Sequence, residues 1–339
     1  MKRILVDMEV NEEALKRLKS IPGANVEVVK AYDEGPRSLP IELIKDINVL
    51  FCTYPPSNLD DMASLEYIQI ASAGYTQLFN LGLVERGIRA CNAQGVFDIP
   101  IGEWCISMMV NLVRNLRGMI RNQEHGVWDR SACFQKEIRD SIVGIWGYGA
   151  IGREIARLSK VLGMKIFVMD RAIPLNSPRN NIYSVPGTGD PECMFPDRTF
   201  VTGQEKEFLK ELDFLILTMP LTKNTEGIVG EEELKALPST AYILNPARGQ
   251  LIKEEALLKA LRGGWIAGAA LDTHYYYPMP ADHPLWCFPN VIMTPHISGS
   301  SLSQNFTARI WDIFVQNIER YVHGRPLLNE LSQSQLKGE

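Results

Sequence analysis

Short apolar runs alternate with amphipathic stretches along almost the whole chain, and this alternation most constrains its fold. Continuous apolar runs are typical of parallel strands that are buried on both faces, and the stretches between them have the spacing of helices that cover such strands. The pattern predicts an α/β protein. With 339 residues, the chain is long enough for two domains, each with its own core.

The apolar runs form two series. In the first hundred residues the predicted strands are Arg3–Val6, Val26–Val29, Val49–Thr53, Tyr67–Ile70 and Ile88–Asn92, with helices near Glu12–Lys19 and Ile41–Ile47. The second series consists of Ile142–Trp146, Lys165–Met169, Phe214–Met219, Tyr242–Asn245, Ala267–Leu271 and Val291–Thr294. Each series predicts one doubly wound unit.

Three other segments qualify this pattern. Apolar residues recur at helical spacing from Ile101 to Ile120, which predicts one helix with a stripe wide enough to need cover from another domain or subunit. The stretch from Ala172 to Thr202 is rich in Pro, Gly, Asn and Asp and is interpreted as an irregular insertion. After Ser303, a final amphipathic helix is expected to pack on the first domain; its apolar face contains Ile310, Trp311, Phe314, Ile318 and Tyr321.

Charge and composition exclude several classes of function. The chain has 35 Lys and Arg against 40 Asp and Glu, a net charge of -5, so it offers no basic field for nucleic acid. Its apolar runs are too short for a signal-peptide core or a membrane span, and we expect a cytoplasmic protein without a membrane partner. The six cysteines and five histidines show no metal-ligand spacing, so no metal site and only reduced thiols are expected.

A glycine-rich segment follows the first strand of the second series. Gly147, Gly149 and Gly152 fit Gly-x-Gly-x-x-Gly, a weak signal alone but a stronger one between an apolar strand and an amphipathic helix. In this context the loop turns tightly and presents free amides and a helix N-terminus to a pyrophosphate. The alternative is a glycine turn without a nucleotide. The positions between the glycines are Tyr148, Ala150 and Ile151.

The next strand ends in Asp170. A carboxylate at this place accepts both ribose hydroxyls of NAD and repels the additional phosphate of NADP, so NAD is the predicted cofactor. Arg171 follows directly, and a guanidinium at this turn is also able to hold that phosphate.

Further motifs, each at a predicted strand end, suggest a family. They are Thr218-Met219-Pro220-Leu221-Thr222, Asn245-Pro246-Ala247-Arg248-Gly249, Ala269-Ala270-Leu271-Asp272 and Thr294-Pro295-His296. Together with the glycine loop, and from the Ser72-Ala73-Gly74 turn onward, the chain resembles the D-isomer-specific 2-hydroxyacid dehydrogenases. The resemblance implies a Rossmann cofactor domain, 101–300, inserted into a flavodoxin-like substrate domain formed by 1–100 and 301–339.

The resemblance also implies roles for individual residues. Arg248 holds the substrate carboxylate and carbonyl, and His296 exchanges the proton as hydride moves to or from the nicotinamide. The amides of Ala73 and Gly74 bind the carboxylate, and Asp272 binds the nicotinamide amide. Further cofactor contacts are expected at Thr218, Pro220, Pro246 and Ala247, and further substrate contacts at Ser72 and Tyr75.

Chemistry supports the two central roles independently. A planar guanidinium is suited to bidentate carboxylate recognition, and Arg248 follows a strand end, where open α/β sheets bind ligands. Imidazole is the side chain best matched to proton transfer near neutral pH, and His296 lies at another strand end. The alternative for Arg248 is a surface ion pair, and the alternative for His296 is a structural role. Of the other histidines, His125 and His323 are interpreted as solvated, whereas His274 and His283 remain candidates.

One position departs from the family pattern. The family carries a glutamate directly before a proline in the segment after Leu-Asp, and that glutamate pairs with the histidine. Here Tyr277 precedes Pro278, so a tyrosine is the third member of the predicted catalytic set. We considered an aromatic pocket, although ordinary half-buried tyrosines are the simpler interpretation. The tyrosines concerned are Tyr54, Tyr75, Tyr275, Tyr276 and Tyr277.

A tyrosine beside His296 has a consequence for proton transfer. A neutral phenol does not stabilise imidazolium as a carboxylate does, so we expect His296 to be mainly neutral at about pH 7. A neutral imidazole takes a proton from a hydroxyl, and on this argument reduction is favoured only in acid.

The predicted function is therefore an NAD-dependent oxidoreductase acting on a small 2-hydroxy or 2-keto acid. The alternatives are an NAD(H)-sensing interaction protein and an NAD-assisted lyase or hydrolase that oxidises its substrate transiently. The apolar stripe predicts a homodimer formed through the cofactor domain.

Overall fold

A computed structural model describes residues 1–32, 35–131, 135–171 and 181–338. These residues divide into two compact units. Unit 1 lies within Met1–Phe97, Arg179–Val185 and Ser300–Glu339, and unit 2 lies within Asp98–Pro178 and Pro186–Gly299. Each unit is built around one parallel sheet. The prediction of two doubly wound α/β domains is confirmed.

Unit 1 has a five-stranded sheet in the order β2-β1-β3-β4-β5, with all neighbours parallel. This is the flavodoxin-like order, in which strands are added to the sheet in one direction up to β2 and in the other direction from β3 onward, so that the switch point lies between β1 and β3. The strands are β1 (Lys2–Asp7), β2 (Ala24–Val28), β3 (Val49–Cys52), β4 (Tyr67–Ile70) and β5 (Arg89–Cys91).

Alternating side chains of this sheet face two apolar layers. Ile4 of β1 packs on the side of α1 (Glu12–Ser20) and α9 (Gln304–Val322), whereas Leu5 packs with α2 (Ile41–Ile44) on the other side. On α9, Phe314 stacks on Phe51 with ring centroids 4.1 Å apart. The prediction that the last long helix returns to the N-terminal strands is confirmed. The short helices of unit 1 are η1 (Leu59–Asp61), η2 (Thr76–Leu78) and α10 (Gln333–Leu336).

Unit 2 has a seven-stranded parallel sheet in the order β12-β11-β10-β9-β6-β7-β8. Counted from β6, this is the 3-2-1-4-5-6 Rossmann order with one further strand. The strands are β6 (Ile142–Trp146), β7 (Lys165–Asp170), β8 (Arg198–Val201), β9 (Phe214–Leu217), β10 (Tyr242–Asn245), β11 (Gly268–Leu271) and β12 (Val291–Met293).

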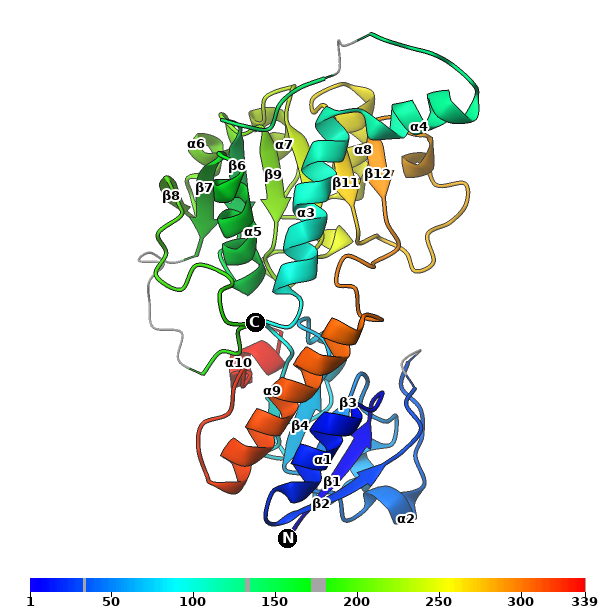
Figure 1. Cartoon of the computed structure of the whole chain (residues 1–339), viewed down its shortest axis with the longest axis vertical. Coiled ribbons are helices and arrows are strands. Elements are labelled where there is room, and N and C mark those ends of the chain that lie inside the picture. The colour runs from blue at the N-terminus through cyan, green and yellow to red at the C-terminus, as the bar shows by residue number, and fades with distance from the viewer. Residues whose placement is uncertain (33–34, 132–134, 172–180, 339) are drawn as a thin grey trace. The chain divides into compact units, whose positions relative to one another are not determined.

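Helices cover both faces of the unit 2 sheet. Within unit 2, α3 (Asp98–Val113) and α5 (Ala150–Val161) lie side by side on one face, and α7 and α8 lie behind it (Figure 1). In open sheets covered in this way, ligands bind at the carboxyl ends of the strands. The other helices are α4 (Leu116–Glu124), α6 (Glu205–Leu209), α7 (Glu231–Ala236), α8 (Glu254–Arg262), η3 (Gly249–Leu251) and η4 (Pro284–Cys287).

Two sequence predictions need correction here. The helix predicted over 101–120 is broken, because Asn115 has φ +48° and separates α3 from α4. Asparagine is one of the few residues that adopts this left-handed conformation readily. In the predicted irregular insertion, the structure contains strand β8, whose few residues pair with β7 at the sheet edge. Residues 172–180 of that insertion lie outside the described residues.

No helix in the described part of the chain combines the length and apolar character that crossing a membrane requires. Over the same residues, no group of three or more His, Cys, Asp or Glu side chains is arranged to hold a metal ion.

Candidate active site

The glycine loop has the backbone geometry that a pyrophosphate requires. Gly147 has φ +102°, and a Cβ there would lie 2.9 Å from the Met219 amide nitrogen. A Cβ on Gly152 would collide with the Gly147 carbonyl oxygen, so both positions exclude a side chain. Gly149, by contrast, faces open space, and no side chain caps the amides of α5, which begins at Ala150. The loop thus leaves an accessible anion site at a helix N-terminus.

The residues between the glycines have structural roles. The Tyr148 side chain is fully buried, and its hydroxyl donates to Asp190 Oδ2 at 2.6 Å. The Arg153 guanidinium lies 5.1 Å from the centre of the same ring. These contacts attach the segment after residue 186 to the loop. Ile151, in the first turn of α5, is half-buried. Sequence reasoning did not identify Asp190, because no motif links it to the loop.

Asp170 lies next to this loop at the end of β7. Its Oδ2 accepts a hydrogen bond from the Tyr148 amide at 2.8 Å, and its Oδ1 accepts one from the Arg171 amide at 2.7 Å. Arg171 is exposed. The carboxylate is therefore fixed beside the glycine loop, where an adenine ribose is bound in Rossmann domains.

Two other predicted cofactor residues follow β9. Thr218 Oγ1 donates to the Gly147 carbonyl at 2.5 Å, which joins the end of β9 to the glycine turn. Pro220 is exposed, and its carbonyl accepts from Thr225 Oγ1 at 2.7 Å. Pro246, after β10, is buried. The Thr218 side chain thus stabilises the glycine turn through this hydrogen bond.

Arg248 is positioned by the turn after β10. Asn245 Oδ1 accepts from the amides of Ala247 at 3.1 Å and Arg248 at 3.2 Å, and its Nδ2 donates to the Arg248 carbonyl at 2.7 Å. A Cβ on Gly249 would lie 2.6 Å from the His274 carbonyl carbon, so only glycine allows the two turns to approach. A buried amide and a glycine therefore hold the half-buried Arg248 close to the His274 turn.

His296 is held by an unusual backbone conformation. It has φ +58°, and its amide donates to the Asp272 carbonyl at 2.8 Å. The Asp272 carboxylate accepts from Thr294 Oγ1 at 2.6 Å and from the amides of Ile297 at 2.9 Å and Ser298 at 3.0 Å. Asp272 has no exposed surface. Its side chain stabilises the loop that carries His296, and the contact with a nicotinamide amide that the family resemblance implied stays a prediction.

Tyr277 contacts His296 directly. Its hydroxyl lies 3.0 Å from Nδ1 of His296 and accepts from the His274 amide at 3.3 Å. The peptide bond between Tyr277 and Pro278 is cis. The tyrosine therefore occupies the place beside the imidazole that the sequence pattern assigned to it.

The surroundings of His296 lower the pKa of its imidazole below the ordinary value of 6.5. Partial desolvation is the largest cause, and the positive charge of Arg248 and the nearby His274 act in the same direction, whereas Asp272 opposes them. The pKa of Tyr277 is raised, mainly because burial disfavours the phenolate. The lowered pKa of His296 favours the neutral imidazole, and the mainly neutral state at about pH 7 stays a prediction.

The other histidines have different partners. His274 is buried, and its Nε2 lies 2.8 Å from the Thr294 carbonyl. His283 is buried 2.6 Å from a Glu254 carboxylate oxygen. His125 and His323 are exposed, as predicted. His274 and His283 thus hold their own segments together.

The three consecutive tyrosines do not form one aromatic wall. Tyr275 packs against the apolar core of unit 2, and Tyr276 donates to Glu254 at 3.3 Å. Tyr277 alone reaches His296. In unit 1, Tyr54 is partly exposed, and Tyr75 is buried against Phe79.

In unit 1, the turn after β4 has unused donors. Asn92 Nδ2 donates to the Ala73 carbonyl at 2.7 Å, and Ser72 Oγ donates to the Gly74 carbonyl at 2.6 Å. Among the described residues, no acceptor is recorded for the amides of Ala73 and Gly74. Two adjacent free amides are suited to an anion. Tyr75 closes the turn as a buried residue.

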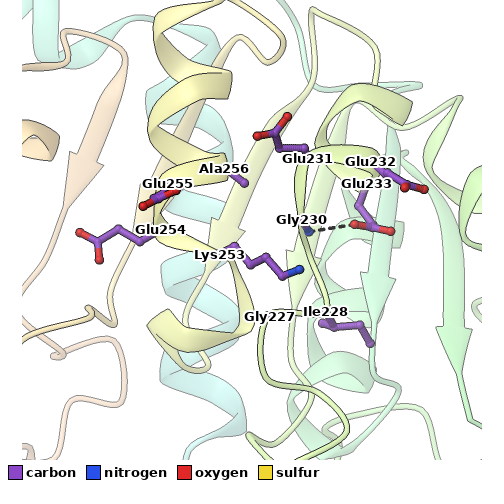
Figure 2. Close-up of a pocket in the computed structure, with 10 residues that line it drawn as sticks. All are labelled: Gly227, Ile228, Gly230, Glu231, Glu232, Glu233, Lys253, Glu254, Glu255 and Ala256. Carbon is purple, nitrogen blue, oxygen red and sulfur yellow. Dashed lines mark hydrogen bonds between the residues drawn. The ribbon is translucent and has the colours of Figure 1, made fainter.

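A separate pocket of about 870 Å³ lies between α7 and α8 of unit 2 (Figure 2). Lys253 extends into it, and Glu233 accepts from the Gly230 amide at 2.8 Å. Its acidic lining repels a carboxylic acid, so this pocket does not suit the predicted substrate. The acidic residues are Glu231, Glu232, Glu233, Glu254 and Glu255.

The geometry described so far defines a class: a Rossmann-type nucleotide-binding protein with an arginine and a histidine at neighbouring turns. Comparison with known proteins identifies the family. The family model described as "D-isomer specific 2-hydroxyacid dehydrogenase, NAD binding domain" matches residues 106–298. A glyoxylate reductase from Thermococcus gammatolerans is 30% identical over 287 residues, which are 81% of this chain and 80% of that protein.

Solved structures show the same fold. A D-isomer specific 2-hydroxyacid dehydrogenase family protein from Aeromonas salmonicida superposes with a TM-score of 0.79 at 24% identity, covering 98% of this chain and 99% of that one. An NADPH-dependent glyoxylate/hydroxypyruvate reductase from Sinorhizobium meliloti gives a TM-score of 0.75 at 21% identity, covering 99% and 100%. The chain belongs to the D-isomer specific 2-hydroxyacid dehydrogenase family and is an NAD(P)-dependent oxidoreductase.

Proposed function

We propose that the enzyme interconverts a small 2-keto acid and its 2-hydroxy acid, with Arg248 binding the carboxylate and His296 exchanging the proton. The observation that carries this proposal is the meeting of the two turns: Gly249 packs against His274, and Tyr277 bonds to the His274 amide and contacts His296. The charge of Arg248 accordingly acts to lower the pKa of His296. A cation this close to an imidazole suits a substrate whose carboxylate lies next to the reacting carbon. The nicotinamide supplies the hydride for reduction and accepts it for oxidation.

The names of two relatives support the proposed substrate class. Glyoxylate and hydroxypyruvate, which appear in those names, are small 2-keto acids. Substrate contacts by Ser72, Ala73, Gly74 and Tyr75 stay a prediction. An increase in KM without loss of kcat, on replacing Gly74 by proline, is the result expected if the turn binds the carboxylate.

We further propose NAD as the preferred cofactor. The Asp170 carboxylate is fixed by two amides beside the glycine loop, and its negative charge repels a 2′-phosphate. The NADPH-dependent relative shows that the fold also accepts the phosphorylated cofactor. A higher kcat/KM with NADPH than with NADH would show that Arg171, and not Asp170, determines the cofactor preference.

The direct test is reduction of glyoxylate and hydroxypyruvate with NADH, followed by the absorbance of the nicotinamide. We expect stoichiometric oxidation of NADH and formation of the 2-hydroxy acid, and loss of both in Arg248→Gln. Product formation without net oxidation of NADH would point to a transient-oxidation lyase or hydrolase. Absence of turnover with a wide panel of keto and hydroxy acids would contradict the proposal.

The proposed assembly is a homodimer through unit 2. On α3 the stripe is buried at Cys105 and Met109, but on α4 it is exposed, with Met119 and Ile120 at 42% and 46%. Exposed apolar side chains in one row favour packing against a second copy of the chain, which would remove them from water. Sedimentation at micromolar concentration tests this, and a monomer that Met119→Glu leaves unchanged would contradict it.

A further inference from the structure

The Tyr277 hydroxyl lies where it is able to influence which ring nitrogen of His296 carries the proton. The phenolic oxygen accepts a hydrogen bond from the His274 amide, which only donates, at 3.3 Å. Nδ1 of His296 lies 3.0 Å from the phenolic oxygen, so the phenolic hydrogen has this nitrogen within hydrogen-bond reach.

A phenolic hydrogen directed at Nδ1 selects one tautomer of the imidazole. When Nδ1 accepts a hydrogen bond, a neutral imidazole carries its single ring proton on Nε2. A glutamate at the same position would accept from Nδ1 and leave Nε2 without a proton. The tyrosine thus converts the outer nitrogen of His296 from a base into a donor.

We propose that Tyr277 and His296 form a two-proton relay for keto-acid reduction, a proposal that rests on the function given above. As hydride adds to the carbonyl carbon, the electron pair of the C=O π bond moves to oxygen, and that oxygen takes the proton of His296 Nε2. Nδ1 takes the phenolic proton of Tyr277 in the same step. Imidazole ends neutral, with its proton on Nδ1, and Tyr277 ends as a phenolate.

The transfer is downhill and the phenolate has neighbours that stabilise it. An alkoxide is a much stronger base than a phenolate, so the proton moves toward the substrate. The phenolate keeps the His274 N–H bond and faces the positive charge of Arg248, whereas Asp272 acts against it. The starting state returns when water gives a proton to Nε2 of the exposed His296 and Nδ1 passes its proton back to the phenolate of Tyr277.

The relay changes the pH dependence expected from sequence alone. A lone neutral imidazole gives up no proton to a keto oxygen, which is why reduction was expected only in acid. The structure adds the phenolic proton, which the sequence argument did not include. The charged and titratable groups that face His296 are Arg248, Asp272, His274 and Tyr277. With the relay, reduction continues above the lowered pKa of His296 and declines only as Tyr277 itself ionises.

The kinetic test is the single-turnover rate of keto-acid reduction by NADH as a function of pH. We expect the wild-type rate to change less than about twofold between about pH 6.5 and pH 8.5, whereas the Tyr277→Phe rate falls about tenfold per pH unit above the pKa of its imidazole. In mixtures of light and heavy water, two protons in flight give a curved dependence in the wild type and a straight one in Tyr277→Phe. Parallel decline of both enzymes would overturn the relay.

A second measurement does not depend on activity. Nitrogen NMR of protein labelled at the histidine rings, assigned by comparison with His296→Gln, reports which ring nitrogen carries the proton at alkaline pH. We expect Nε2 in the wild type and Nδ1 in Tyr277→Glu, with melting temperatures confirming that each variant is folded. A wild-type proton on Nδ1 would overturn the relay. If no keto acid is turned over, the proposed function fails. The NMR measurement then still shows whether Tyr277 determines which ring nitrogen of His296 carries the proton.

Discussion

Around the glycine loop the backbone itself makes the candidate site, whereas around His296 side chains make it. At Gly147 and Gly152 a Cβ would collide with neighbouring backbone atoms, and the open space in front of Gly149 is the candidate anion site. His296 depends instead on the Asp272 carboxylate and on the Tyr277 hydroxyl. The difference teaches that substitutions at the glycine loop, the cofactor end of the candidate site, are expected to disturb the backbone. Substitutions around His296, the chemical end, are expected to change the pKa and the hydrogen bonds of one imidazole.

The largest expected effect is at the chemical end. Replacing His296 with Asn should lower kcat for keto-acid reduction by about 100- to 10,000-fold, because it removes the general acid. The Kd of NADH, measured by fluorescence, should not change, since the cofactor end is separate. His125→Asn, at an exposed histidine, is the matched control. A loss below about tenfold would transfer the acid-base role to another group.

At the cofactor end, Asp170→Ser should lower kcat/KM with NADH by about 10- to 100-fold, the value of losing charge-assisted hydrogen bonds worth about 1.5–3 kcal/mol. The same change should improve kcat/KM with NADPH, because the like charge is gone. His296 is untouched, so kcat at saturating cofactor should stay close to the wild-type value. Equal losses with both cofactors would show that Asp170 does not select between them.

Two alanine variants separate folding from binding within the glycine loop. Gly152→Ala puts a Cβ against the Gly147 carbonyl and should lower the free energy of unfolding by about 1–3 kcal/mol. Gly149→Ala faces open space and should leave stability unchanged while weakening NADH binding, since the methyl group lies where the pyrophosphate is expected. Comparable unfolding midpoints in urea for both variants would contradict this assignment.

Much of the fold followed from the sequence because buried parallel strands have a distinctive apolar pattern. Each predicted strand of unit 2 corresponds to one in the sheet, and the glycine loop was recognisable because its backbone demands glycine. Strand β8 was missed because its first two residues are exposed and polar, as befits an edge. The break at Asn115 was missed because one left-handed residue leaves the apolar spacing almost unchanged.

The site was predictable to a smaller extent. The family resemblance and the strand ends predicted Arg248 and His296, whose roles stay a prediction, whereas the supports that position these residues were not predicted. Asn245 acts within its own turn, whereas Gly249 contacts the His274 turn and the buried Asp272 contacts the loop that carries His296, both distant in sequence. Such roles depend on which turns meet at the sheet edge, and spacing along the chain does not encode that.

The central claim is that His296 is mainly neutral at physiological pH because Tyr277 adds no negative charge at the place where the family resemblance implied a glutamate. The most direct test is the pKa of His296, measured by NMR titration in the wild type and in Tyr277→Glu. We expect the wild-type pKa below the ordinary value of 6.5 and the variant pKa higher by about one to three units, because a carboxylate stabilises imidazolium. A wild-type pKa above 6.5, or identical values in the two proteins, would contradict the account.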